Sequence, residues 1–149
     1  MQLTKHTDYA LRVLIWLGYR ERATIAEIAG AHRISQNHLM KVVHQLAKLG
    51  YVETVRGKGG GLKLARPAHE ISVGEVVRAT EETLYVVECL ADDYAGDCRL
   101  NAACMLKSAL RDAQNAFFET LDQCSLQDLL PKRRESAVVR FHKSTGASH

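Results

Sequence analysis

Residues 35–64 read SQNHLMKVVHQLAKLGYVETVRGKGGGLKL and contain the pattern that decides the fold. Ser35 is a typical helix N-cap, and the apolar side chains that follow it recur at helical spacing. Gly50 then ends the helix, and residues 51–55 and 62–64 alternate like two strands around a turn of glycines and cations. The stretch therefore predicts a helix followed directly by a basic β-hairpin.

The segment N-terminal to this stretch predicts two further helices. Residues 9–19, YALRVLIWLGY, have the apolar spacing of a buried helix, with Thr4 or Thr7 as its cap. Thr24 and Glu27 form a capping-box pattern that opens a short helix, which a turn separates from the next one. Two helices joined by a short turn, with a hairpin after the second, are typical of a winged helix-turn-helix.

The distribution of charge indicates that this winged domain binds a polyanion. Residues 1–66 carry 11 Lys/Arg against 4 Asp/Glu, whereas residues 67–149 carry 9 against 13. We expect the start of the second helix to face base edges in the major groove, and the cationic glycine turn to enter or flank the minor groove. The glycine run lacks the P-loop pattern, so a nucleotide site is not favoured. The candidate DNA-binding residues are Ser35, Gln36, Asn37, His38, Lys41, Arg56, Lys58, Gly59 and Gly60.

The C-terminal half predicts a dimer helix. A second capping box at Ser72 opens a short helix, and a long helix is expected over about residues 102–121. The apolar stripe of this helix is longer than packing against one small domain requires. We therefore expect it to form a two-fold contact with a second copy of the chain, with packing against its own domain as the alternative. A further short helix is expected at residues 126–130, followed by a flexible basic tail over 131–149. The stripe consists of Leu106, Leu110, Ala113, Phe117 and Leu121.

Residues 89–104, CLADDYAGDCRLNAAC, hold three of the four cysteines. Their polar, acidic middle favours a loop, on which three thiols can converge on one point, and a metal centre is the interpretation that fits best. Zinc is an alternative, although the C-x8-C-x5-C spacing lacks the short pairs of common zinc sites. A thiol-based redox enzyme is another, although no C-x-x-C is present. Cys124 lies outside the motif and is expected to pack as a small hydrophobe.

Several of these segments together resemble a known family. TKHTDYALR at 4–12, HLMKVV at 38–43 and VRGKGGGL at 55–62, followed by three cysteines and a long helix, are similar to the winged-helix iron–sulfur regulators, and within them to the nitric-oxide-sensing repressors of the NsrR type. The resemblance covers roughly residues 1–130. It implies a homodimer that binds a roughly palindromic operator in double-stranded DNA. It also implies a 2Fe–2S or 4Fe–4S cluster whose damage by nitric oxide releases the operator and derepresses genes for nitric oxide detoxification.

The resemblance also implies a set of cluster ligands. Cys89, Cys98 and Cys104 would bind the cluster, and Asp8 of the other subunit would complete the set. Considered without the resemblance, Asp8 is a carboxylate in the first turn of a helix, where it complements the positive helix end. The relatives of the IscR type use a histidine three residues after the last cysteine, but Lys107 stands there and cannot serve while protonated.

One related class remains as the close alternative. The iron-responsive regulators of the RirA type are also similar around residues 116–118, so a response to iron or cluster status is the second function that the sequence allows. Eight residues separate Cys89 from Cys98, more than is usual in the family, but added loop length costs little conformational entropy.

The expected fold class is mainly α with a small β-hairpin wing. The predicted units are a winged helix-turn-helix domain over 1–82, a cysteine loop over 83–104, a dimerisation helix with a short following helix over 105–130, and the tail. Hydrophobic residues make up 46% of the chain and charged residues 25%, as in ordinary globular proteins. No apolar run approaches the ~20 residues of a membrane helix, and no signal-peptide core is present, so we expect a cytoplasmic protein rather than a membrane protein. The expected role is that of a regulator and not of an enzyme.

Overall fold

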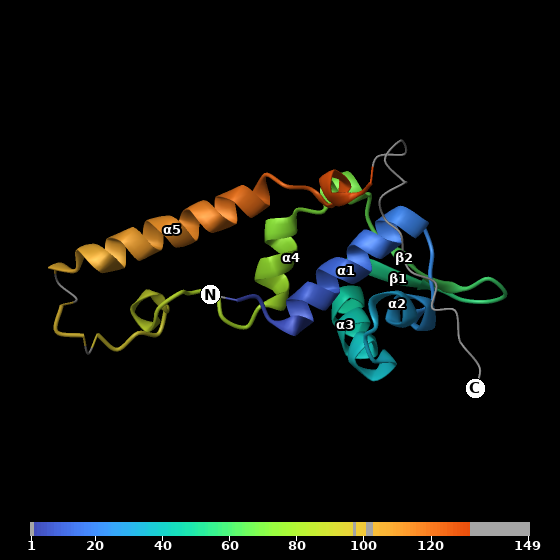
Figure 1. Cartoon of the computed structure of the whole chain (residues 1–149), viewed down its shortest axis with the longest axis horizontal. Coiled ribbons are helices and arrows are strands. Elements are labelled where there is room, and N and C mark those ends of the chain that lie inside the picture. The colour runs from blue at the N-terminus through green and yellow to red at the C-terminus, as the bar shows by residue number, and fades with distance from the viewer. Residues whose placement is uncertain (1, 97, 101–102, 132–149) are drawn as a thin grey trace, which may run out of the picture.

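The computed structural model describes residues 2–96, 98–100 and 103–131. The elements in chain order are α1 (Lys5–Arg20), α2 (Ile25–His32), α3 (Gln36–Lys48), β1 (Val52–Val55), β2 (Gly61–Leu64), the 3-10 turn η1 (Ala68–Glu70), α4 (Val73–Thr80), the 3-10 turn η2 (Glu88–Leu90), α5 (Met105–Asp122) and the 3-10 turn η4 (Leu126–Leu129). Figure 1 shows α1 to α4 and the hairpin gathered into one body, from which α5 extends to one side. This arrangement confirms the expected fold class.

Helix α1 lies at the centre of the body. Its fully buried side chains, among them Val13 and Leu14, face a core that α2, α3, α4 and β2 complete. The helix begins at Lys5, four residues before the apolar pattern predicts, because its first turn is polar and therefore has no hydrophobic periodicity. The cap is Thr4, whose side chain accepts the N–H of Thr7 at 3.3 Å.

The helix-turn-helix forms as its caps predict. Thr24 and Glu27 make both bonds of the capping box at the start of α2. Arg33 then adopts a left-handed conformation, with φ at 55°, and turns the chain into α3. The inner face of α3 is buried as expected, whereas its outer face is exposed. The buried residues of α3 are Leu39, Val42, Val43 and Leu46.

Strands β1 and β2 form the expected antiparallel hairpin, with Val52 opposite Leu64 and Val55 opposite Gly61. Ala23, between α1 and α2, bridges to Leu62 and ties the hairpin to the helices. The wing is therefore fixed at its base, while its turn projects away from the body (Figure 1).

Helix α5 differs from the expectation at its start. It begins at Met105 rather than near residue 102, because the side chain of Cys104 is its N-cap and accepts the N–H of Lys107 at 3.3 Å. None of its residues is buried, and it contacts the rest of the chain through α4 and η2. The short helix expected at 126–130 is the 3-10 turn η4. The predicted tail lies outside the described residues beyond Pro131.

The end of α5 packs tightly on the start of α4. A side chain added at Gly74 would overlap the Asp122 carboxylate, and its Cβ would lie 2.9 Å from the backbone nitrogen of Asp122. Only a glycine therefore allows the two helices to approach this closely. No helix in the described part of the chain is long and apolar enough to cross a membrane.

We predict that Gly74→Ala lowers the free energy of unfolding by about 1–3 kcal/mol, because the added methyl group forces α5 away from α4. Gly30→Ala is the matched control. Gly30 lies in α2 with nothing within 4 Å of an added Cβ, so that variant should gain about 0.4–1 kcal/mol from reduced freedom of the unfolded chain. Urea unfolding followed by circular dichroism measures both. Equal stability of the two variants would contradict the tight approach.

Candidate nucleic-acid interface and cysteine loop

The start of α3 presents polar side chains to solvent. Ser35 caps the helix by accepting the N–H of His38 at 3.3 Å, which fixes the direction of the first turn. Gln36 and Asn37 are exposed beside it, and so is Lys41 one turn later. His38 is exposed as well. All four residues of this helix that are predicted to contact DNA therefore lie on its solvent-facing side.

His38 differs from its neighbours because its ring has an intramolecular contact. The ring packs edge-on against Tyr9 of α1, with 5.7 Å between the ring centroids. His38 is still solvent-exposed, so this contact orients the imidazole without covering it. The sequence placed His38 near base edges but did not reveal that α1 supports it, because the partner lies 29 positions earlier in the chain.

The wing turn exposes both of its predicted cations, Arg56 and Lys58. Gly59 has φ at 78°, in the region that favours glycine, and a Cβ at Gly60 would lie 2.5 Å from the Val55 carbonyl oxygen. The glycines are thus required by the turn itself, in addition to any contact with a ligand. Arg22, which the sequence analysis did not single out, donates from Nη1 to the Gly59 carbonyl at 2.9 Å and braces the turn.

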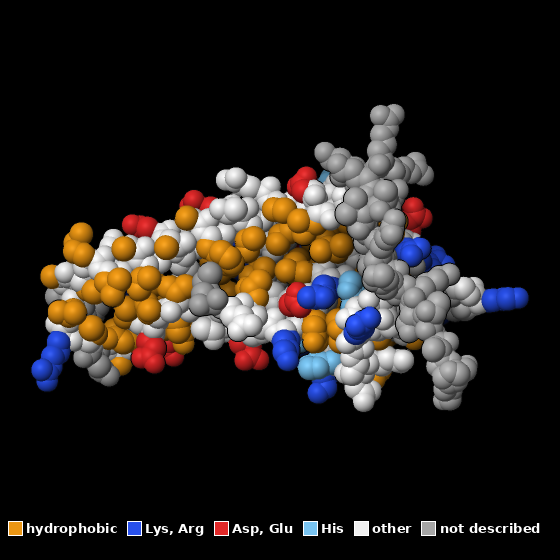
Figure 2. Space-filling view, in the orientation of Figure 1, with side chains coloured by type: hydrophobic (Ala, Val, Ile, Leu, Met, Phe, Trp, Pro, Cys, Tyr) orange, Lys and Arg blue, Asp and Glu red, His pale blue; other side chains and the backbone are white. Residues whose placement is uncertain are grey.

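Charge and apolar surface are separated on the molecule. Figure 2 shows Lys and Arg side chains at the outer end of the wing, and hydrophobic side chains over much of the half that α5 and the cysteine loop form. Three residues of that half are strongly exposed despite being apolar, at 70%, 82% and 66% of their full accessibility: Leu100, Met105 and Leu106. A basic surface and an exposed apolar surface therefore lie at opposite ends of the molecule.

The three motif cysteines lie on the loop between α4 and α5, and all are free thiols. Cys89 is half-buried in η2, beside α5, whereas Cys98 is exposed and donates its N–H to the Tyr94 hydroxyl at 2.8 Å. Within residues 2–96, 98–100 and 103–131, no three His, Cys, Asp or Glu side chains lie close enough to hold a metal ion. The structure therefore places the thiols on one loop but does not bring them to one point.

The chemistry of these donors nevertheless suits an iron–sulfur cluster. Cys104 caps α5, and its sulfur accepts the backbone N–H of Lys107 at the start of the helix. Thiolates are the usual ligands of such clusters. Cys124 follows the other end of α5, about 27 Å away for an 18-residue helix, and contacts the Ser125 carbonyl. Its place agrees with the interpretation of Cys124 as a bystander.

Asp8 already has a partner within its own chain. Its carboxylate accepts from Arg12 Nε, with 2.9 Å to Oδ2, and the side chain is 46% exposed. The next residue, Tyr9, is the one that supports His38. The segment that enters the cysteine loop is fixed nearby, because Glu81 accepts the N–H of Thr4 at 2.7 Å. Asp8 thus lies at the end of α1 that contacts both the start of α3 and the segment leading into the cysteine loop.

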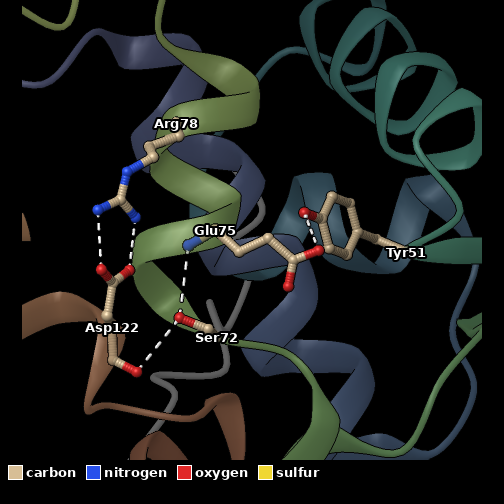
Figure 3. A network of polar contacts seen from close by, with 5 residues as sticks. All are labelled: Tyr51, Ser72, Glu75, Arg78 and Asp122. Atoms are coloured by element: carbon tan, nitrogen blue, oxygen red, sulfur yellow. Dashed lines mark hydrogen bonds and ion pairs between the residues drawn. The ribbon is translucent and has the colours of Figure 1, made fainter.

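A polar network joins the wing to α5 through α4 (Figure 3). Arg78 of α4 forms a two-pronged ion pair with Asp122 of α5, with 2.8 Å from Nη2 to Oδ2. On the same helix, Glu75 accepts from the Tyr51 hydroxyl and from Arg66, both at 2.9 Å. Tyr51 directly precedes β1, so α4 is bonded to the base of the wing and to the end of α5.

The network shifts the pKa values of its acidic groups. The hydrogen bond from Arg78 lowers the pKa of Asp122. Burial raises the pKa of Tyr51 to about 12, and the bond to Glu75 adds to that shift. Burial by itself would raise the pKa of Glu75, but the bonds from Arg66 and Tyr51 outweigh it and lower the value. At neutral pH the network therefore holds two carboxylates ionised and one phenol neutral.

We predict that Asp122→Asn lowers the melting temperature at pH 7, and that the difference from wild type shrinks as the pH falls below 3.8. The folded pKa of Asp122 is depressed, so its contribution is present above the ordinary value of 3.8 and is lost as the pH falls through the folded value. Asp112→Asn is the control, since Asp112 is exposed on the same helix and has no ion pair among the described residues. A pH-independent effect, or an equal one in the control, would refute the assignment.

Comparisons with known proteins identify the family of the chain. The profile of the Rrf2 family, described as an iron-dependent transcriptional regulator, matches residues 3–132. The chain is 49% identical over 136 residues to the HTH-type transcriptional regulator NsrR of Geobacillus kaustophilus, covering 89% of this chain and 92% of that protein. It is 44% identical over 138 residues to the protein of the same name from Bacillus subtilis, covering 91% and 94%.

Solved structures show the same fold. T. potens IscR superposes with a TM-score of 0.68 at 25% identity, covering 87% of this chain and 85% of that one. CymR, the global cysteine regulator of B. subtilis, superposes at 0.70 with 25% identity and covers 87% and 95%. The resemblance proposed from the sequence is thereby confirmed. The chain belongs to the Rrf2 family of transcriptional regulators, is of the NsrR type within that family, and is not an enzyme.

Proposed function

We propose that this protein is a nitric-oxide-sensing repressor that binds operator DNA as a homodimer in the cytoplasm. Three free thiols on one loop, between a DNA-reading domain and an uncovered apolar helix, are the observation that carries the proposal. Cys89, Cys98 and Cys104 would hold an iron–sulfur cluster, 2Fe–2S or 4Fe–4S, with Asp8 of the partner subunit as the fourth ligand. Such a cluster, when bound, supplies iron that reacts directly with nitric oxide.

A second copy of the chain is the natural cover for α5. The helix carries an apolar stripe, yet none of its residues is buried in the single chain. Leaving that much apolar surface in water is costly, and symmetric operators favour two-fold dimers. This observation counts against the alternative in which α5 packs back on its own domain.

The DNA contacts follow from exposure and charge. Gln36 and Asn37 would read base edges, and Lys41 would contact phosphate or base at the edge of the groove. Arg56 and Lys58 would place two cations on the minor groove, whose negative potential attracts them. A dimer then requires two half-sites separated by about one helical turn or a multiple of it.

Two routes within the chain connect the cysteine loop to the reading surface. On α1, Asp8 precedes Tyr9, which supports His38 at the start of α3. Through α4, the Arg78–Asp122 pair fixes the end of α5, and Glu75 fixes the base of the wing. A change in the position of Asp8 or α5 would therefore be transmitted through packed helices to α3 and the wing. In a dimer, such a change would alter the distance between the two DNA-binding domains.

An iron-dependent response is the second candidate, because the family profile is described as iron-dependent. In that case loss of iron would release the operator without nitric oxide. A zinc site on the same thiols is the structural alternative, and the colour of the anaerobic protein distinguishes it, since a cluster is brown and zinc is colourless.

We predict that Arg56→Ala weakens operator binding and reduces the slope of log K against log salt concentration by about two units, because the proposed dimer loses one phosphate contact from each of its two wings. Arg111→Ala is the control, since Arg111 is exposed on α5, which extends from the body on the side opposite the wing. Fluorescence anisotropy over a range of salt concentrations measures both slopes. Binding by Arg56→Ala that is as tight and as salt-sensitive as wild type would remove the wing from the interface.

We predict that the wild-type protein purified without oxygen is brown, and that nitric oxide or removal of the cluster weakens operator binding at least tenfold. Cys98→Ser should contain little iron, whereas Cys124→Ser should match wild type and serves as the control. Iron and sulfide analysis, absorbance and anisotropy check these outcomes. Release by an iron chelator but not by nitric oxide would favour the iron-dependent candidate, and oxygen-free protein without iron or sulfide would end the proposal.

A further inference from the structure

Met40 is an unusual residue on the exposed face of α3. The side chain is 48% exposed, although it lies in the middle of a stripe whose other members are polar. It lines a surface depression together with Asn37, Lys41 and His44, which follow each other at helical spacing. A singly exposed apolar side chain needs no explanation by itself. Here, however, it is the apolar part of a hollow on the surface that would face DNA.

We infer that Met40 reads the 5-methyl group of a thymine, and thereby specifies a T·A pair in each half-site. In the major groove the thymine methyl is the apolar group that distinguishes this base pair, whereas the other groups are hydrogen-bond donors and acceptors. A flexible, polarisable thioether adapts to such a contact without a hydrogen-bond partner. This inference rests on the proposed DNA-binding function and goes beyond the polar residues already assigned.

The position of Met40 along the helix supports this role. Met40 lies three residues after Asn37, about 4.5 Å farther along the axis, which corresponds to between one and two base steps. Asn37 and Met40 can therefore contact neighbouring base pairs from the same stripe. His44, one turn beyond, borders the other side of the depression and limits where the methyl group can lie.

The test combines a protein variant with removal of the methyl group from DNA. The probe is a duplex that the full-length wild-type protein selects from a random pool. Each thymine in one half-site is replaced in turn by deoxyuridine, which lacks only the 5-methyl group. At one thymine we expect wild-type affinity to fall about fourfold, and about 15-fold when both half-sites are changed.

The variants make the result specific to Met40. Met40→Ala, which removes the side chain from both half-sites, should bind the unmodified duplex about as weakly as wild type binds the duplex with deoxyuridine in both half-sites, and should not distinguish the two duplexes. Leu49→Ala removes another exposed apolar side chain, 41% accessible and just after α3, and should discriminate as wild type does. Met40→Leu should retain much of the discrimination. Equal discrimination by wild type and Met40→Ala at every thymine would overturn the inference, whereas failure to select any duplex would instead overturn the DNA-binding proposal.

Discussion

The ion pair between Arg78 and Asp122, formed over Gly74, is the contact on which the position of α5 depends. No residue of helix α5 is fully buried, and only some, such as Phe117, Phe118 and Leu121, are half-buried, so its packing within the chain constrains its direction weakly. Its C-terminal end is held instead by this pair and by the backbone bond from Val73 to the Cys124 carbonyl, 2.9 Å long. The cysteine loop runs from the end of α4 to the start of α5. The distance that the loop must bridge therefore depends on how this junction orients the two helices.

On its other side, helix α4 contacts the rest of the winged domain. Glu75 bonds to Tyr51 at the base of the wing, and Thr80 bonds to Thr7 within the core at 3.0 Å. The buried hydroxyl pair and the Glu75–Tyr51 bond both restrict sliding of α4, since either bond would have to be given up for the helix to move. The winged domain and α5 are thus connected by one short, well-anchored helix.

Much of the winged domain could be predicted because its determinants are local. Caps at Thr24 and Ser35, the apolar spacing of α3 and the glycine turn each act within a few residues, and each formed as expected. The apolar pattern places the start of α1 too late, because a polar first turn has no periodicity. It places the start of α5 too early, because a cysteine is not a usual cap.

The sequence by itself determined the family, the helix-turn-helix, the hairpin and the presence of three thiols on one loop. Only the tertiary structure showed that Asp8 pairs with Arg12, that Tyr9 supports His38 and that Arg22 braces the wing turn. Apart from the Asp8–Arg12 pair, these contacts join residues 29 or more positions apart, and no local pattern encodes them. The cysteines show a related limit. Their spacing places three thiols on one loop, but within the described residues the loop does not bring them together.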